Sequence, residues 1–133
     1  MTSGVSRISV SIDPDLLTEF DELVKRIGYN RSSAVQLAMR GFLTEHKWKD
    51  LEGVLAGVIT MIYDHHTGGI MEELTHLQHD YTDIISSSTH IHLDHHNCLE
   101  ILAVKGKASQ IKKLANSLEV TRGLKQIRVS MMQ

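Results

Sequence analysis

The sequence predicts an α+β protein made of two modules, a small N-terminal one and a larger C-terminal one. Residues 1–50 show one alternating segment followed by two amphipathic helical patterns. Residues 53–133 show apolar runs in the order β-α-β-β-α-β. Histidine also separates the two parts, because eight of the nine histidines lie between His65 and His96. These three observations predict a domain boundary close to residue 50.

Composition limits the class of protein. The chain has 133 residues, of which 41% are hydrophobic and 23% charged, as in soluble folded domains. No apolar run is long enough to span a bilayer and no secretory signal is visible, so we expect no membrane partner. A single cysteine forms no internal disulfide, which favours a cytoplasmic location. The net charge of −2 gives no indication of nucleic-acid binding.

In the N-terminal module, polar and apolar residues alternate over 7–12, which predicts a half-buried strand. Asp13 and Pro14 predict the start of a helix, because aspartate caps free amides and proline suits the first helical position. Apolar residues follow at helical spacing until Gly28, which predicts the end of that helix. Asn30 or Ser32 is expected to cap a second helix.

One strand and two helices bury too little surface to fold alone. The strand is therefore expected to pair with the same strand of a second chain, which gives an intertwined dimer. This arrangement, with the segment Gly-Tyr-Asn-Arg-Ser-Ser-Ala at 28–34, resembles the ribbon-helix-helix family of transcription regulators. The resemblance implies that the paired strands enter the major groove of DNA.

The resemblance also assigns DNA contacts to particular residues. The outward side chains Arg7, Ser9 and Ser11 would contact base edges, since arginine reaches guanine O6 and N7 and serine serves donors or acceptors. The alternative is an ordinary solvent-exposed strand face. Backbone amides at the start of the second helix are expected to hold a DNA phosphate. They belong to Arg31, Ser32 and Ser33.

The C-terminal module begins with an apolar, β-branched run over 54–63, which predicts a buried strand. Gly68 and Gly69 precede an expected helix. Two further strands are expected over 84–93 and 98–104. A second amphipathic helix over 111–118 and a last strand over 124–131 complete the module. This order is that of the ferredoxin-like fold, with two helices on one face of an antiparallel sheet. The other face keeps apolar side chains, so we expect a partner subunit to cover it.

Residues 89–100 contain four histidines and the only cysteine. His90 and His92 would leave the same face of a strand, and a hairpin at 94–97 would bring Cys98 back beside His92. Imidazoles and a thiolate suit zinc, copper or nickel rather than magnesium or calcium. The alternative is a surface hairpin with scattered histidines and a buried cysteine. His79 is expected on the exposed face of its helix, two residues from the apolar Leu77.

The two modules, together with Gln-His-Asp at 78–80, His-Ile-His at 90–92 and Asn-Cys-Leu-Glu at 97–100, resemble the NikR family of nickel-responsive transcription repressors. The resemblance covers nearly the whole chain. It implies an ACT-type ferredoxin-like regulatory domain and a homotetramer, a dimer of dimers, that binds double-stranded operator DNA. It also implies one high-affinity Ni²⁺ site per subunit, made by His90, His92 and Cys98 of one subunit and His79 of another.

Three imidazoles and a thiolate form a donor set that can lie in a plane, as low-spin Ni(II) accepts, whereas zinc favours a tetrahedron. Cys98 must lose a proton to bind, so affinity is expected to weaken at acid pH. The resemblance places further residues around the ligands, where Glu100 would orient an imidazole ring or serve only in packing. These residues are Tyr63, His65, Gln78 and Glu100.

The sequence departs from the family at a few positions. Some members carry acidic residues on the second helix that form another cation site, whereas this chain has Ser33 and Leu37 there, so that site is in doubt. Gln126 stands at a position where relatives often carry histidine, and we draw no functional conclusion from this difference. Four histidines match no ligand position and are expected to be solvated, the alternative being weaker, adventitious metal sites. These histidines are His66, His76, His95 and His96.

The leading hypothesis is therefore a nickel-responsive, sequence-specific repressor of nickel-related genes. Two alternatives remain open at this point: a sensor of copper or cobalt, and a metal-buffering protein without a DNA function. A metalloenzyme is disfavoured, because four protein ligands in a plane leave little room for a substrate.

Overall fold

The computed structural model describes residues 4–133. The chain divides into two compact units, one ending at Gly41 and the other comprising Phe42–Gln133. No helix within the described residues is long and apolar enough to cross a membrane.

The N-terminal unit contains α1 (Pro14–Arg26) and the first part of α2 (Arg31–Lys47). The predicted helix start is confirmed, because Asp13 Oδ1 accepts hydrogen bonds from the amides of Asp15 and Leu16, at 2.9 and 3.2 Å. The predicted stop is also confirmed: Gly28 has a φ of 81°, a backbone conformation that favours glycine. Asn30 caps α2 by accepting a hydrogen bond from the Ser33 amide at 2.8 Å.

The strand expected over residues 7–12 is not formed within this chain, since the segment before α1 carries neither helix nor strand. The physical reason is that a strand needs a hydrogen-bonding neighbour, and no described segment of the chain pairs with these residues. Apolar side chains of the unit are correspondingly unburied. Of its described residues only Val24 and Ala34 are buried, while Ile8, Val10 and Leu16 are exposed.

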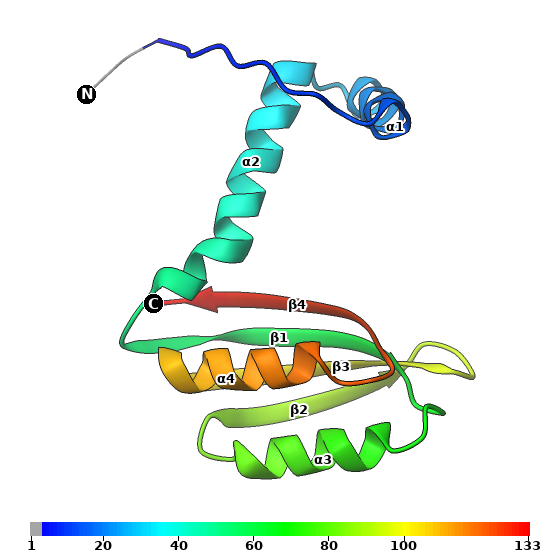
Figure 1. Cartoon of the computed structure of the whole chain (residues 1–133), viewed down its shortest axis with the longest axis vertical. Coiled ribbons are helices and arrows are strands. Elements are labelled where there is room, and N and C mark those ends of the chain that lie inside the picture. The colour runs from blue at the N-terminus through cyan, green and yellow to red at the C-terminus, as the bar shows by residue number, and fades with distance from the viewer. Residues whose placement is uncertain (1–3) are drawn as a thin grey trace. The chain divides into compact units, whose positions relative to one another are not determined.

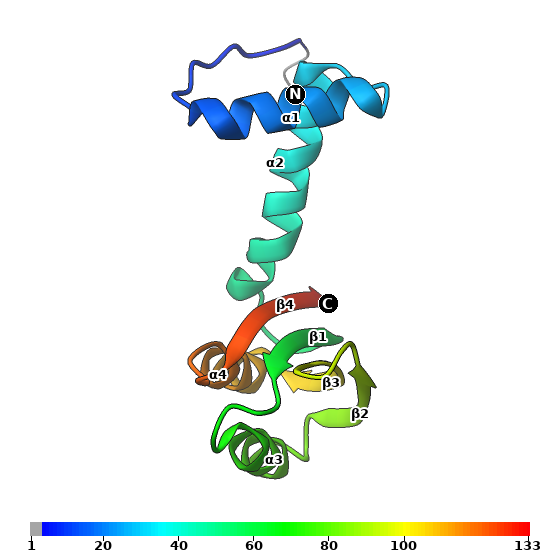
Figure 2. The same cartoon turned by 90° about the vertical axis from the view of Figure 1, so that its right-hand side faces the viewer.

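The C-terminal unit is a four-stranded antiparallel sheet with two helices on one side, as predicted (Figures 1 and 2). The strand order is β2-β3-β1-β4, so the edge strands are β2 and β4. The elements of this unit after α2 are, in chain order, η1 (Trp48–Asp50), β1 (Val54–Asp64), α3 (Ile70–Asp80), β2 (Ile85–His92), β3 (Asn97–Lys107), α4 (Ala108–Glu119) and β4 (Leu124–Met132).

The core lies between the sheet and the helices. Alternate residues of β1 and β3 point into it, as Ile59 and Leu102 do, and α4 contributes Ile111 and Leu114; all four are fully buried. The short helix η1 was not predicted. It inserts Trp48, which is 3% exposed, into the same core.

The opposite face of the sheet remains partly apolar. Val58 on β1 and Ile91 on β2 are 40% and 44% exposed, and Leu93 beyond β2 is 49% exposed. Helices cover only one side of the sheet, so these side chains face solvent in the single chain.

Candidate metal centre

The hairpin formed by β2 and β3 places a histidine against the cysteine. The antiparallel register pairs His92 with Cys98, and His92 Nδ1 lies 3.4 Å from Cys98 Sγ. Asp94 and Asn97 close the turn, since the Leu93 amide donates to the Asn97 carbonyl at 2.9 Å and the Asn97 amide to Asp94 Oδ1 at 2.8 Å. This is the proximity that the sequence predicted for Cys98 and His92.

A third donor comes from the end of β1. Tyr63 pairs with Cys98 across the sheet, and the chain beyond it places His65 beside the hairpin. Ligand atoms of His65, His92 and Cys98 all lie within 4.8 Å of one another, the one such group among residues 4–133. Two imidazoles and a thiol suit a borderline or soft transition metal, so the donor set fits nickel, copper or zinc.

The thiol is protonated at neutral pH before metal binds. Cys98 is buried, and this burial raises the pKa of its thiol, with the nearby negative charges of Glu100 and Asp94 raising it further. A metal that binds Sγ must therefore displace a proton.

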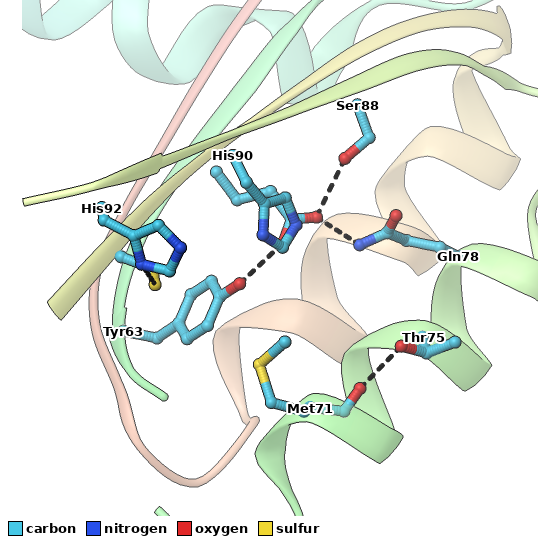
Figure 3. Close-up of polar contacts among 9 residues, drawn as sticks. Tyr63, Met71, Thr75, Gln78, Ser88, His90 and His92 are labelled. Carbon is cyan, nitrogen blue, oxygen red and sulfur yellow. Dashed lines mark hydrogen bonds and ion pairs between the residues drawn. The ribbon is translucent and has the colours of Figure 1, made fainter. Parts of the chain in front are cut away.

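Glu100 is a fully buried carboxylate at the centre of a polar network. Figure 3 shows the side chains of Tyr63, Gln78 and Ser88 directed toward this network. Glu100 accepts hydrogen bonds from the Tyr63 hydroxyl at 2.9 Å, from the Ser88 hydroxyl at 3.2 Å and from the side-chain amide of Gln78. His90 Nε2 lies 2.7 Å from Glu100 Oε1. The carboxylate thus connects β3 to β1, β2 and α3.

The network engages one ring nitrogen of His90, which is not part of the three-donor group. Since Nε2 is engaged by Glu100, Nδ1 is the ring atom left to bind a metal. Burial, followed by the hydrogen bond to Glu100, raises the pKa of Tyr63, so its hydroxyl stays a donor at all ordinary pH values. Ser88 was missed by the sequence reasoning, although its two-residue spacing from His90 on a strand indicates the same face.

His79 lies apart from the three-donor group. It is exposed on α3 and lines a shallow surface hollow of about 530 Å³ with Met71, Glu72, Thr75 and His76. Its neighbour Gln78, labelled in Figure 3, instead donates a hydrogen bond to the buried Glu100. On α3, His79 is therefore exposed to solvent, while Gln78 connects the helix to the sheet of the same chain.

The residues predicted to contact DNA lie in the N-terminal unit. Arg7, Ser9 and Ser11 are exposed. Arg31 makes a bidentate contact with Asp21, through Nη2 at 2.6 Å and Nε at 3.1 Å, and this raises the pKa of Arg31. The Ser33 amide is used by the helix cap, while Ser32 is exposed at the start of α2.

A family model described as the NikR C-terminal nickel-binding domain matches residues 56–132. The chain belongs to the NikR family. The match contains the whole hairpin, His65, His79 and the Glu100 network, so the metal centre described above lies in the nickel-binding domain of this NikR-family chain.

Relatives in the NikR family match over nearly their full length. A protein of Methanococcus maripaludis strain C5 is 46% identical over 130 residues, which cover 96% of this chain and 92% of the relative. One from Methanocaldococcus jannaschii is 45% identical with the same coverage. Both carry the provisional name nickel-responsive regulator, so this chain is a regulator of that family and not an enzyme.

A solved structure shares the fold. An uncharacterized protein from Thermotoga maritima superposes with a TM-score of 0.53 at 12% identity, covering 62% of this chain and all of that chain. This likeness concerns the fold alone.

The Glu100 network leads to a stability prediction. Glu100→Ala should lower the free energy of unfolding by about 3 kcal/mol, because the buried Tyr63 hydroxyl and the Gln78 amide lose their acceptor. Tyr63→Phe removes one donor and leaves the carboxylate its other partners, so it should cost about 1 kcal/mol. Urea unfolding of the metal-free protein measures both values. Equal losses in the two variants would contradict a network centred on Glu100.

Proposed function

We propose that the protein is a nickel-dependent repressor that binds operator DNA as a homotetramer, a dimer of dimers, in the cytoplasm. Residues 1–50 form the DNA-binding domain, and residues 53–133 form the nickel-binding and tetramerisation domain. Each subunit holds one Ni²⁺ ion at high affinity. The observation that carries the proposal is the placement of His92 and Cys98 in contact inside a NikR nickel-binding domain.

The proposed nickel ligands are His90, His92 and Cys98 of one subunit with His79 of another. The ligands from the first subunit are supported by the β2–β3 hairpin. In it Cys98 already contacts His92, and Glu100 orients the ring of His90 through its Nε2 atom. Support for a second subunit comes from the exposure of His79 on the outer face of α3. The ligand atoms of His65, His92 and Cys98 all lie within 4.8 Å of one another. We assign His65 a supporting position beside the ion. When bound, nickel supplies a charged centre that joins two subunits.

The dimeric DNA-binding domain is supported by surface that the single chain leaves uncovered. Apolar residues of the predicted strand and of α1 are exposed, so the unit lacks a core of its own. Pairing of residues 7–12 between two copies would bury Ile8, Val10 and Ile12 and turn the side chains of Arg7, Ser9 and Ser11 toward DNA.

Tetramer formation is supported by the apolar outer face of the sheet, where Val58, Ile91 and Leu93 are 40–49% exposed. A partner subunit would cover this face. Nickel binding and subunit arrangement then become one equilibrium, and nickel favours the arrangement in which two DNA-binding dimers meet two half-sites. Nickel acts on DNA binding only through its different affinity for the two arrangements.

The proposal predicts nickel-dependent DNA binding. DNA fragments selected from a random pool with Ni²⁺ present should bind more tightly with nickel than without it. Arg7→Ala should weaken that binding about 10- to 100-fold, the loss expected for one arginine–guanine contact. Fluorescence anisotropy at fixed salt measures both effects.

Arg26→Ala is the matched control, because Arg26 is also exposed but lies at the far end of α1. It should change the affinity far less than Arg7→Ala. If nickel leaves the affinity for DNA unchanged, the regulatory role is excluded. If Arg7→Ala and Arg26→Ala weaken DNA binding equally, the assigned DNA-contacting face is excluded.

The raised pKa of Cys98 gives a pH prediction. The thiol holds its proton at pH 7, so raising the pH removes the competitor of the metal and strengthens binding. Nickel affinity should rise about tenfold per pH unit between pH 7 and pH 8, as measured by competition with a chelator of known affinity. Cys98→Ala should remove most of this slope. An affinity independent of pH in the unmodified protein would contradict nickel binding by the thiolate.

A further inference from the structure

A second group of histidines lies at the same end of the sheet but outside the cluster of His65, His92 and Cys98. His66 follows β1, and His95 and His96 form the turn between β2 and β3. Their ring centroids form a triangle: 5.3 Å from His66 to His95, 5.1 Å from His66 to His96, and 5.0 Å from His95 to His96. All three side chains are exposed.

The backbone holds the two loops in place. The His65 amide donates to the His96 carbonyl at 3.0 Å, which ties the β1 loop to the hairpin turn. Asp64 Oδ1 accepts from the His66 amide at 2.9 Å, and Asp94 Oδ1 accepts from the His96 amide at 2.8 Å. The loops are therefore fixed relative to each other before any ion arrives.

The spacing of the rings suits shared coordination. A nitrogen about 2.1 Å from a metal places its ring centre about 3.2 Å from the ion, and two such rings at a tetrahedral angle lie about 5 Å apart. The observed separations of the ring centres, 5.0–5.3 Å, match this value, but the ring nitrogens of the three residues do not all lie within 4.8 Å of one another in this structure. His66 Nε2 is now 3.0 Å from the His95 carbonyl, so binding requires exposed rings to turn about their side-chain torsions.

The surrounding charge favours a cation. Asp64 and Asp94 flank the triangle, where the Asp64 carboxylate accepts from the His66 amide and the Asp94 carboxylate from the His96 and Asn97 amides. The ammonium group of Lys125 is engaged by Asn97 Oδ1 at 2.6 Å.

We propose that His66, His95 and His96 form a second, solvent-facing site for a divalent transition metal such as Ni²⁺, with water in the remaining positions. Three neutral imidazoles without a thiolate suit nickel, copper and zinc. The site differs from the thiolate site in its donors and in its exposure. His65 lies between the two, because its ring is 4.2 Å from that of His66 and 6.0 Å from that of His92.

The test is equilibrium dialysis of the full chain against Ni²⁺, with the sulfur-to-nickel absorption recorded in parallel. The triple variant H66Q/H95Q/H96Q should bind one fewer ion per chain than the unmodified protein and keep the full absorption. Each single variant should weaken the second site about tenfold or more. His46→Gln, an exposed histidine on α2 outside the triangle and the thiolate site, is the control and should leave both readings unchanged.

Cys98→Ala separates this proposal from the proposed nickel regulator. It should abolish the absorption while the additional ion remains bound, and loss of that ion in Cys98→Ala would overturn an independent second site. An unchanged ion count in the triple variant would also overturn it. Absence of absorption in the unmodified protein would overturn the thiolate site alone, provided that the triple variant still binds one fewer ion.

Discussion

The structure of the metal centre depends on the pairing of β2 with β3. Two consecutive pairs on one face of this hairpin, His92 with Cys98 and His90 with Glu100, place two imidazoles, a thiol and a buried carboxylate together. A shift of one residue in this register would move His90 and His92 to the other face of the sheet. The turn closed by Asp94 and Asn97 and the Glu100 network both fix the register.

Glu100 also connects the ligands that one chain would contribute to two different proposed sites. Its carboxylate holds His90 on β2, and through the Gln78 amide it holds α3, whose next residue is His79. If His79 binds nickel in a neighbouring subunit's site, as proposed, a displacement of α3 would act on the carboxylate that contacts His90. This gives a short physical path between metal binding and the position of a helix on the subunit surface.

Much of the nickel-binding domain could be predicted from the sequence, because its strands and helices carry regular apolar spacing and glycine stops. The contact of Cys98 with His92 also followed from a short turn on an alternating strand. The closeness of His65 to His92 and Cys98 could not be derived in this way. It depends on the pairing of β1 with β3, in which Tyr63 lies opposite Cys98, 35 residues further along the chain. The strand at residues 7–12 needs a neighbour that the single chain does not supply, and Trp48 lies in a helix too short to show periodicity.

In the proposed function, nickel is held between subunits, by Cys98 of one and His79 of another. Chains with His79→Ala and chains with Cys98→Ala should each fail to retain nickel against EDTA. When equal amounts are unfolded and refolded together, random mixing should restore about a quarter of the wild-type nickel content, because a complete site then forms wherever the two kinds of chain meet correctly. Full retention by the His79→Ala protein alone, or no recovery in demonstrated mixed tetramers, would contradict the account.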